Sequence, residues 1–174
     1  RQCLESMQIN KNIEVSIKCR IGLGNKLSYE FFEEFIDEIL KSGIKIIYVH
    51  ARNAILSGIS PKANRNIPCL NYNFVKLIKS KYPFATFVLN GGIDSIEKAI
   101  KLKSEFDGVM LGRLIQNNPF CLKNIDSLFY DSNKKYYIGE DTVHEYFEYI
   151  KPNVGKESIF RLMSPFLNIF FGVP

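Results

Sequence analysis

Residues 86–92, Thr-Phe-Val-Leu-Asn-Gly-Gly, form an apolar, strand-like run that ends in two glycines. Asp94 and Glu97 follow in a D-x-x-E spacing, a variant of the capping box, which predicts a helix to about Ser104. A further apolar run at residues 108–111 predicts the next strand. A strand, a helix and a second strand in this order are typical of a βαβ unit, whose two strands lie parallel.

The same alternation extends towards the N-terminus. Apolar runs predict strands at residues 15–19 and 44–49. Between them, Ser28 is expected to cap a helix with one apolar stripe, and Gly43 stands where this helix should end. A further helix is expected over residues 72–81. Four strands that alternate with helices predict an α/β fold built on a parallel sheet.

The pattern changes downstream of the fourth strand. A fourth helix is expected to begin near residues 118–119, but after about residue 131 no convincing strand follows. Thr142 is expected to cap one helix, and a second, over residues 158–171, is expected to break near Pro165. The sequence therefore predicts an α/β part, residues 1–130, and the start of an all-α part, residues 131–174.

Length and charge limit the possible classes. The chain has 174 residues, 46% of them hydrophobic, which is enough for a buried core but fewer than the roughly 250 residues of a complete (β/α)₈ barrel. The net charge of +5 fits a polyanionic partner such as nucleic acid, and equally an ordinary basic protein. No apolar run approaches the roughly 20 residues that cross a bilayer, so no membrane partner is expected.

Several common site types lack their motifs. A third glycine is missing after Gly22 and Gly24, where Leu27 stands instead, and there is no G-x-x-x-x-G-K-[ST], so neither a Rossmann fingerprint nor a P-loop is predicted. The cysteines form no C-x-x-C pair, so we expect reduced thiols in an intracellular protein, with no metal site. They are Cys3, Cys19, Cys69 and Cys121.

Each predicted strand ends in polar, cationic or glycine residues. Ligands bind at the carboxyl ends of the strands in α/β sheets and barrels, so these residues are the first candidates for a site. A buried lysine at a strand end also needs an anionic partner, and a histidine there can bind a ring edge or simply stabilise the structure. The candidates are Lys18 and Arg20, His50 and Arg52, Asn90 to Gly92, and Gly112 with Arg113.

The last two strand ends favour a phosphate group. Gly91 and Gly92 lack a Cβ, so the backbone can approach an anion closely. The helix that Asp94 opens would add positive potential. Gly112 would allow a second close approach, and Arg113 could bind the phosphate with its guanidinium fork. Asn-Gly-Gly alone could be an ordinary turn, but together the two ends are typical of the phosphate site of many TIM barrels.

The connection at residues 51–70 is long for a loop between a strand and a helix, where 2–6 residues are usual. It carries Arg52, Lys62 and Arg65. Loops of this length are often functional, and these cations suit RNA phosphates or bases, although they could also be simply solvated.

Together these stretches resemble the tRNA-dihydrouridine synthase family, most closely its DusA branch. The resemblance covers roughly residues 10–125 in unbroken order, and its most specific motif is Ser-Pro-Lys-Ala-Asn-Arg at residues 60–65, which generic FMN barrels lack. The matching stretches are residues 15–22, 49–52, 56–65, 90–93, 107–113 and 118–119.

The resemblance implies an FMN enzyme that uses NADPH to reduce the C5–C6 bond of uridines in the tRNA D-loop. It implies a TIM barrel followed by a helical domain, of which this chain would hold strands five to eight and the start of the second domain. Lys18 and His50 would lie against the flavin ring. The FMN phosphate would be held by Asn90, Gly91, Gly92, Gly112 and Arg113, and tRNA would be bound by Lys62, Arg65 and Arg52.

One part of the family pattern is missing from this sequence. The Asn-x-Gly-Cys-Pro segment with the family's catalytic cysteine does not occur, and Cys19 should not be given that role. We therefore expect a fragment that is inactive alone, lies in the cytoplasm or an organelle, and self-associates through the open edges of a half-barrel. The alternatives are an FMN oxidoreductase of small molecules and a non-catalytic RNA-binding remnant.

Overall fold

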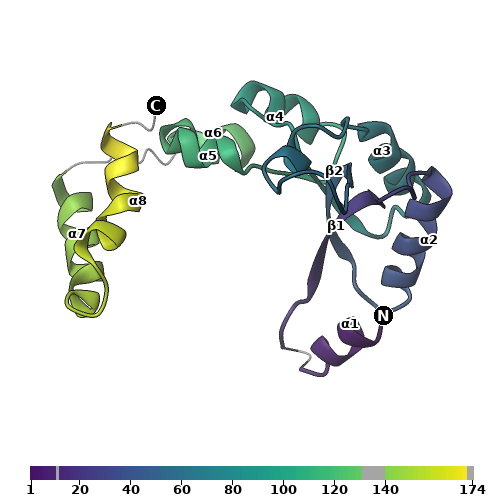
Figure 1. Cartoon of the computed structure of the whole chain (residues 1–174), viewed down its shortest axis with the longest axis horizontal. Coiled ribbons are helices and arrows are strands. Elements are labelled where there is room, and N and C mark those ends of the chain that lie inside the picture. Colours follow the sequence, from purple (N-terminus) through teal and green to yellow (C-terminus); the bar gives the residue numbers. More distant parts are fainter. Residues whose placement is uncertain (11, 131–139, 172–174) are drawn as a thin grey trace. The chain divides into compact units, whose positions relative to one another are not determined.

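The computed structural model describes residues 1–10, 12–130 and 140–171 (Figure 1). The chain divides into two compact units, Arg1–Leu111 and Gly112–Pro174. In the described residues, no helix combines the length and the apolar character needed to cross a membrane.

The first unit is built on a four-stranded parallel sheet whose spatial order β1-β2-β3-β4 follows the sequence. This arrangement confirms the predicted α/β fold and is consistent with half of a TIM barrel. A short helix, α1 (Gln2–Met7), precedes the sheet. The strands are β1 (Ser16–Leu23), β2 (Ile46–Ala54), β3 (Thr86–Asn90) and β4 (Gly108–Met110), and the helices between them are α2 (Tyr29–Leu40), α3 (Tyr72–Lys81) and α4 (Ile96–Lys103).

The core lies between one face of the sheet and these helices. Side chains alternate along a strand, so Phe87 and Leu89 of β3 are fully buried, whereas Thr86, Val88 and Asn90 are only partly covered. Each helix buries one stripe against the sheet. The buried helix residues are Phe32, Ile36 and Ile39 of α2, Val75 and Ile78 of α3, and Ala99 and Leu102 of α4.

The helix ends agree in part with the predictions. Ser28 caps α2, because its hydroxyl accepts a hydrogen bond from the Phe31 amide at 3.2 Å. Gly43 follows the end of α2 with a positive φ of 88°, and its amide donates to Leu40 O. The predicted cap of α4 is one residue early. Ser95, in extended backbone, accepts from the Lys98 amide at 3.1 Å, so Ser95 takes the place expected for Asp94.

Two strands are longer than predicted. The apolar pattern ends at residues 19 and 49, but β1 continues to Leu23 and β2 to Ala54. Beyond a shift in register after Arg20, Gly22 pairs with Asn53. Backbone pairing needs no apolar side chain, so the two strands continue through the polar residues that follow the apolar runs.

The named elements of the second unit are helices and 3₁₀ turns, and its described residues also hold an isolated bridge between Val154 and Glu157. The helix that was expected to begin near residues 118–119 is not found there. A helix begins earlier, at Arg113, with Gly112 as its N-cap. Pro119 starts a 3₁₀ turn instead. The elements are α5 (Arg113–Asn117), η2 (Pro119–Leu122), α6 (Ile125–Tyr130), α7 (Glu140–Ile150), η3 (Lys151–Asn153) and α8 (Ile159–Phe171).

Two further details of the helical part differ from expectation. Thr142 lies inside α7, which has already begun at Glu140. Helix α8 continues through position 165 without a break. Tyr146 of α7 stacks on Phe166 with a ring-centroid distance of 4.6 Å and donates to Leu162 O, which holds the turns on both sides of position 165. The predicted boundary between residues 130 and 131 borders residues 131–139, outside the described residues, and stays a prediction.

Candidate functional site

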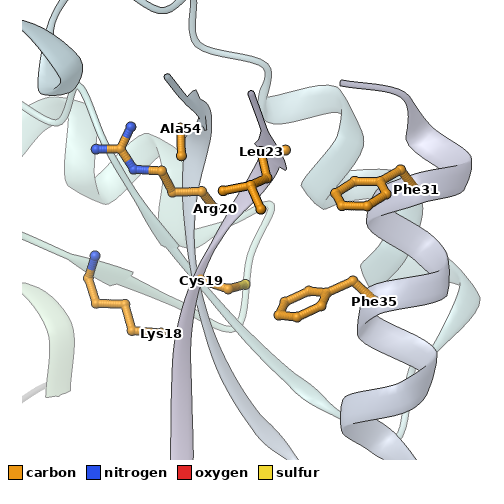
Figure 2. Close-up of a pocket in the computed structure, with 8 residues that line it drawn as sticks. Lys18, Cys19, Arg20, Leu23, Phe31, Phe35 and Ala54 are labelled. Atoms are coloured by element: carbon orange, nitrogen blue, oxygen red, sulfur yellow. The ribbon is translucent and has the colours of Figure 1, made fainter. Parts of the chain in front are cut away.

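The register of the sheet brings the predicted strand-end residues onto one face. Arg20 lies opposite His50, and His50 lies opposite Asn90. Lys18 precedes Arg20 by two residues and therefore shares its face. Figure 2 shows Lys18 and Arg20 on one side of β1, pointing away from the helix that carries Phe31 and Phe35. The side chains thus lie on the sheet face opposite the helices. Asn90 ends β3, whereas Lys18, Arg20 and His50 lie within strands that continue to Leu23 and Ala54.

The turn after β3 needs glycine at two positions. Gly91 and Gly92 have φ angles of 106° and 66°, in the left-handed region. A Cβ on Gly91 would stand 2.5 Å from His50 Cδ2, and a Cβ on Gly92 would clash with Leu70. Tyr72 also donates its hydroxyl proton to Gly91 O at 2.6 Å. The close approach of this backbone to its neighbours therefore explains both glycines.

Asn90 ties the ends of two strands together. Its side-chain amide donates to Met110 O, the last carbonyl of β4, at 2.8 Å. Gly112, two residues beyond, caps α5, and an added Cβ would meet no atom within 4 Å. Arg113 is the first residue of α5. Because Gly112 and Arg113 begin the second unit and the Asn-Gly-Gly turn belongs to the first, their joint phosphate role stays a prediction.

The charges of four cations act together at this site, and they are Lys18, Arg20, Arg52 and Arg65. Burial and then the charge of Arg20 lower the pKa of Lys18. Burial, followed by the charges of Arg52 and Arg65, lowers the pKa of Arg20. In the described part of the chain, no carboxylate lies within ion-pair distance of these four side chains. The site therefore has an excess of positive charge that suits an anionic ligand.

Arg52 holds the long loop between β2 and α3. Its Nη1 donates to Asn66 O at 3.0 Å and to Pro68 O, and the residue is only 9% exposed. Its Nε is buried without a hydrogen-bond partner. The structure thus gives Arg52 a role inside the protein, and its predicted contact with tRNA stays a prediction.

Lys62 and Arg65 lie on the surface of the same loop. Lys62 is the N-cap of η1 (Ala63–Arg65), a single 3₁₀ turn that Arg65 ends, and both side chains are exposed. Sequence reasoning missed Asn64 between them, whose amide and carbonyl oxygens both accept from Arg20 Nη1 at 2.9 Å. The sequence pointed to Asn64 only indirectly, through Arg20 near the end of a predicted strand and the long loop at residues 51–70. Arg20 and Asn64 meet only after this loop folds back.

A cavity of about 520 Å³ lies between β1 and α2 (Figure 2). Cys19, Phe31 and Phe35 line its apolar side. Burial raises the pKa of Cys19 to about 12, so this thiol stays protonated at neutral pH and is a poor nucleophile. That Cys19 is not catalytic stays a prediction. Among the described residues, no group of His, Cys, Asp and Glu could hold a metal ion.

Residues 1–166 match the family described as "Dihydrouridine synthase (Dus)". The chain is 37% identical over 153 residues to the tRNA-dihydrouridine(20/20a) synthase of Shewanella oneidensis, covering 88% of this chain and 46% of that protein. It is 33% identical over 174 residues to the protein of the same name from Yersinia pestis, covering 99% and 50%. For the Pseudomonas syringae pathovar tomato protein the values are 40% over 130 residues, covering 75% and 39%.

The chain spans about half the length, or less, of these curated relatives. The match agrees with the resemblance noted from residues 15–22, 60–65 and 90–93. By its sequence match over most of its length, together with the parallel sheet and the strand-end residues, this chain belongs to the dihydrouridine synthase family.

Proposed function

We propose that this chain is part of an FMN-dependent tRNA-dihydrouridine synthase that reduces the C5–C6 bond of D-loop uridines with NADPH. The observation that carries the proposal is the register of the sheet, which aligns Arg20, His50 and Asn90 on one face, with Lys18 two residues before Arg20 on the same face. Family membership supports the reaction class, and relatives that carry the name tRNA-dihydrouridine(20/20a) synthase support tRNA as the substrate.

The residues fit a flavin with an anionic tail. Among the described residues, no carboxylate lies within ion-pair distance of Lys18 or Arg20 on this face. Gly91 and Gly92 leave the backbone of their turn without side chains. Bound flavin would supply the hydride. Lys18 and His50 would bind and orient its ring. Its phosphate would be held by Asn90, Gly91, Gly92, Gly112 and Arg113.

The tRNA would be bound by the loop between β2 and α3. Lys62 and Arg65 are exposed on one turn and would contact RNA phosphates or bases, and Arg52 would support them by holding the loop. The target uridine must leave the RNA stack to reach a flavin at the strand ends. Reduction also requires an acid that protonates the uracil ring. In the family this acid is the cysteine of the Asn-x-Gly-Cys-Pro segment, and none of the four cysteines of this sequence lies in such a segment.

The function is tested with this chain and with a longer protein that contains it. We expect the 174 residues to quench FMN fluorescence and to bind unmodified tRNA transcript with affinity that falls steeply with salt. They should form no dihydrouridine with FMN, NADPH and tRNA, whereas a protein that adds the Asn-x-Gly-Cys-Pro segment should. Flavin binding without tRNA binding in both proteins would favour an oxidoreductase of small molecules, and tRNA binding without flavin would favour an RNA-binding remnant.

We also propose a cytoplasmic location, with an organelle as the alternative, because tRNA modification is the proposed task. Self-association is proposed because β1 and β4 are the outer strands of the described sheet and each has one edge outside the sheet ladder.

A further inference from the structure

The loop between β2 and α3, residues 55–71, is held by side chains as well as by its own backbone. Its single 3₁₀ turn is closed by Arg65 N–H to Lys62 O at 3.2 Å, and the Ser60 hydroxyl accepts from the Ala63 amide at 3.1 Å. Three residues make one turn of a 3₁₀ helix, so Lys62 and Arg65 lie one above the other. Two exposed cations therefore share one side of this turn.

Asn64 fastens this turn to the end of the sheet. Its amide nitrogen donates to Ile55 O at 2.5 Å, and its amide oxygen accepts from Ile55 N–H at 3.1 Å. A single side chain thus makes the pair of hydrogen bonds that a neighbouring strand would make with Ile55. The contact joins residues nine positions apart and closes the first half of the loop.

Arg20, on β1, also binds Asn64. Its Nη1 donates to Asn53 O at 2.8 Å and to both oxygens of Asn64 at 2.9 Å. These acceptors belong to β2 and to the 3₁₀ turn, so one guanidinium connects both strands to the loop. Because the acceptors are neutral, the positive charge of Arg20 is kept at the site.

We propose that Asn64 and Arg20 are positioning residues that hold Lys62 and Arg65 in place before RNA arrives, so that binding does not have to order the loop. The inference rests on the proposed binding of tRNA by these two cations. Neither Asn64 nor Arg20 needs to touch RNA for this role, because its effect is to lower the entropy lost on association.

The test compares Asn64→Ala with Lys62→Ala, using fluorescence anisotropy of unmodified tRNA transcript over a series of salt concentrations. Asn64→Ala keeps every cation, so we expect affinity about 3- to 10-fold weaker at each salt concentration with an unchanged salt slope. Lys62→Ala removes one phosphate contact, so its slope should fall by about 0.7 to 0.9. Asn73→Ala, an exposed position on α3, is the matched control and should bind like the original chain.

Hydrogen exchange supplies a readout that needs no RNA. In Asn64→Ala the Ile55 amide loses its acceptor and should exchange at least about tenfold faster, whereas the amide of Leu89 in the core should not change. A uniform rise at both amides would mean general destabilisation and would overturn a positioning role. Arg20→Lys, which keeps the charge but loses the guanidinium fork, should repeat both effects if Asn64→Ala does not fold.

The outcomes separate this inference from the proposed function. Salt-sensitive binding by the original chain with equal affinity in Asn64→Ala overturns the inference and leaves the proposed function standing. If the salt slope of tRNA binding falls in Asn64→Ala as much as in Lys62→Ala, the inference is also overturned, because a phosphate contact has then been lost. If the original chain shows no salt-sensitive binding, the proposed tRNA function fails and the positioning role fails with it.

Discussion

Lys18, which is proposed to bind the flavin ring, carries a charge that lowers the stability of the fold. Its side chain shares a face with Arg20, and burial together with that charge lowers the pKa of Lys18. A lysine whose pKa is lowered by folding takes up a proton less readily in the folded protein than in the unfolded chain. The unfolding free energy should therefore rise as the pH increases from the lowered pKa towards the ordinary value of about 10.5, because the unfolded chain binds more protons in this range.

Replacing Lys18 with Met removes the charge and keeps an apolar stem. We expect a small increase in melting temperature at neutral pH, since the repulsion by Arg20 is relieved. We expect FMN binding to weaken by about tenfold, the scale of one lost hydrogen bond to a charged group. Differential scanning fluorimetry and FMN titration would measure the two effects. Unchanged FMN affinity would exclude Lys18 from the flavin site.

Gly91 is predicted to tolerate no side chain. Gly91→Ala places a Cβ 2.5 Å from His50 Cδ2 at a φ of 106°, so clash and backbone strain add. We expect the unfolding free energy to fall by about 2–4 kcal/mol, measured by urea denaturation. Gly58→Ala is the control, because Gly58 has a φ of 82° but no atom within 4 Å of an added Cβ. It should cost only about 1 kcal/mol, and equal losses would show that strain alone matters.

At the scale of elements, the order and type of strands and helices in the first unit were predictable, because apolar periodicity reports which face is buried. Helix α3 begins and ends where the pattern predicts, at Tyr72 and Lys81. The ends of β1 and β2 were not predictable, since polar residues such as Arg20 and Asn53 continue the backbone ladder. Pairing depends on the neighbouring strand, which local pattern does not contain.

The candidate site was predictable only where it depends on local sequence. His50 and Asn90 follow apolar runs, Lys18 lies near the end of one, and the parallel sheet brings the three to one face. The roles of Asn64 and of Arg52 were not visible, because both depend on how a long loop folds back onto β1 and β2. Composition indicates that a loop carries cations, but only the folded loop shows which of them hold it.

The cap of α4 gives a test at this scale. Two candidates, Asp94 and Ser95, stand side by side, and the Ser95 hydroxyl accepts from the Lys98 amide. Ser95→Ala should lower the unfolding free energy by about 1 kcal/mol in urea denaturation, the usual cost of losing an N-cap. Asp94→Ala should cost less than about 0.5 kcal/mol, because the Asp94 side chain is exposed and its ion pair with Lys98 lies at the surface. The opposite order of losses would restore Asp94 as the cap.

In the first unit as a whole, helices cover one face of the sheet, but apolar side chains beside β1 remain exposed to solvent. Phe35 is 41% exposed and Leu23 is 48% exposed, and both line the cavity between β1 and α2. Beside them, β1 is an outer strand of the described sheet. Apolar side chains next to a strand edge favour association with another chain, and a second copy brings the same surface.

We therefore expect the 174-residue chain to self-associate at micromolar concentration, and Phe35→Lys to weaken this by about tenfold or more. The substitution places a charge in the cavity wall, where it must be desolvated on association, while the half-exposed position limits its effect on folding. Leu77→Lys is the matched control, because Leu77 is 45% exposed on α3 and does not line the cavity. Sedimentation velocity over a concentration series decides the matter. A monomer at all concentrations for the original chain would contradict the prediction, and equal weakening by both substitutions would place the interface away from β1.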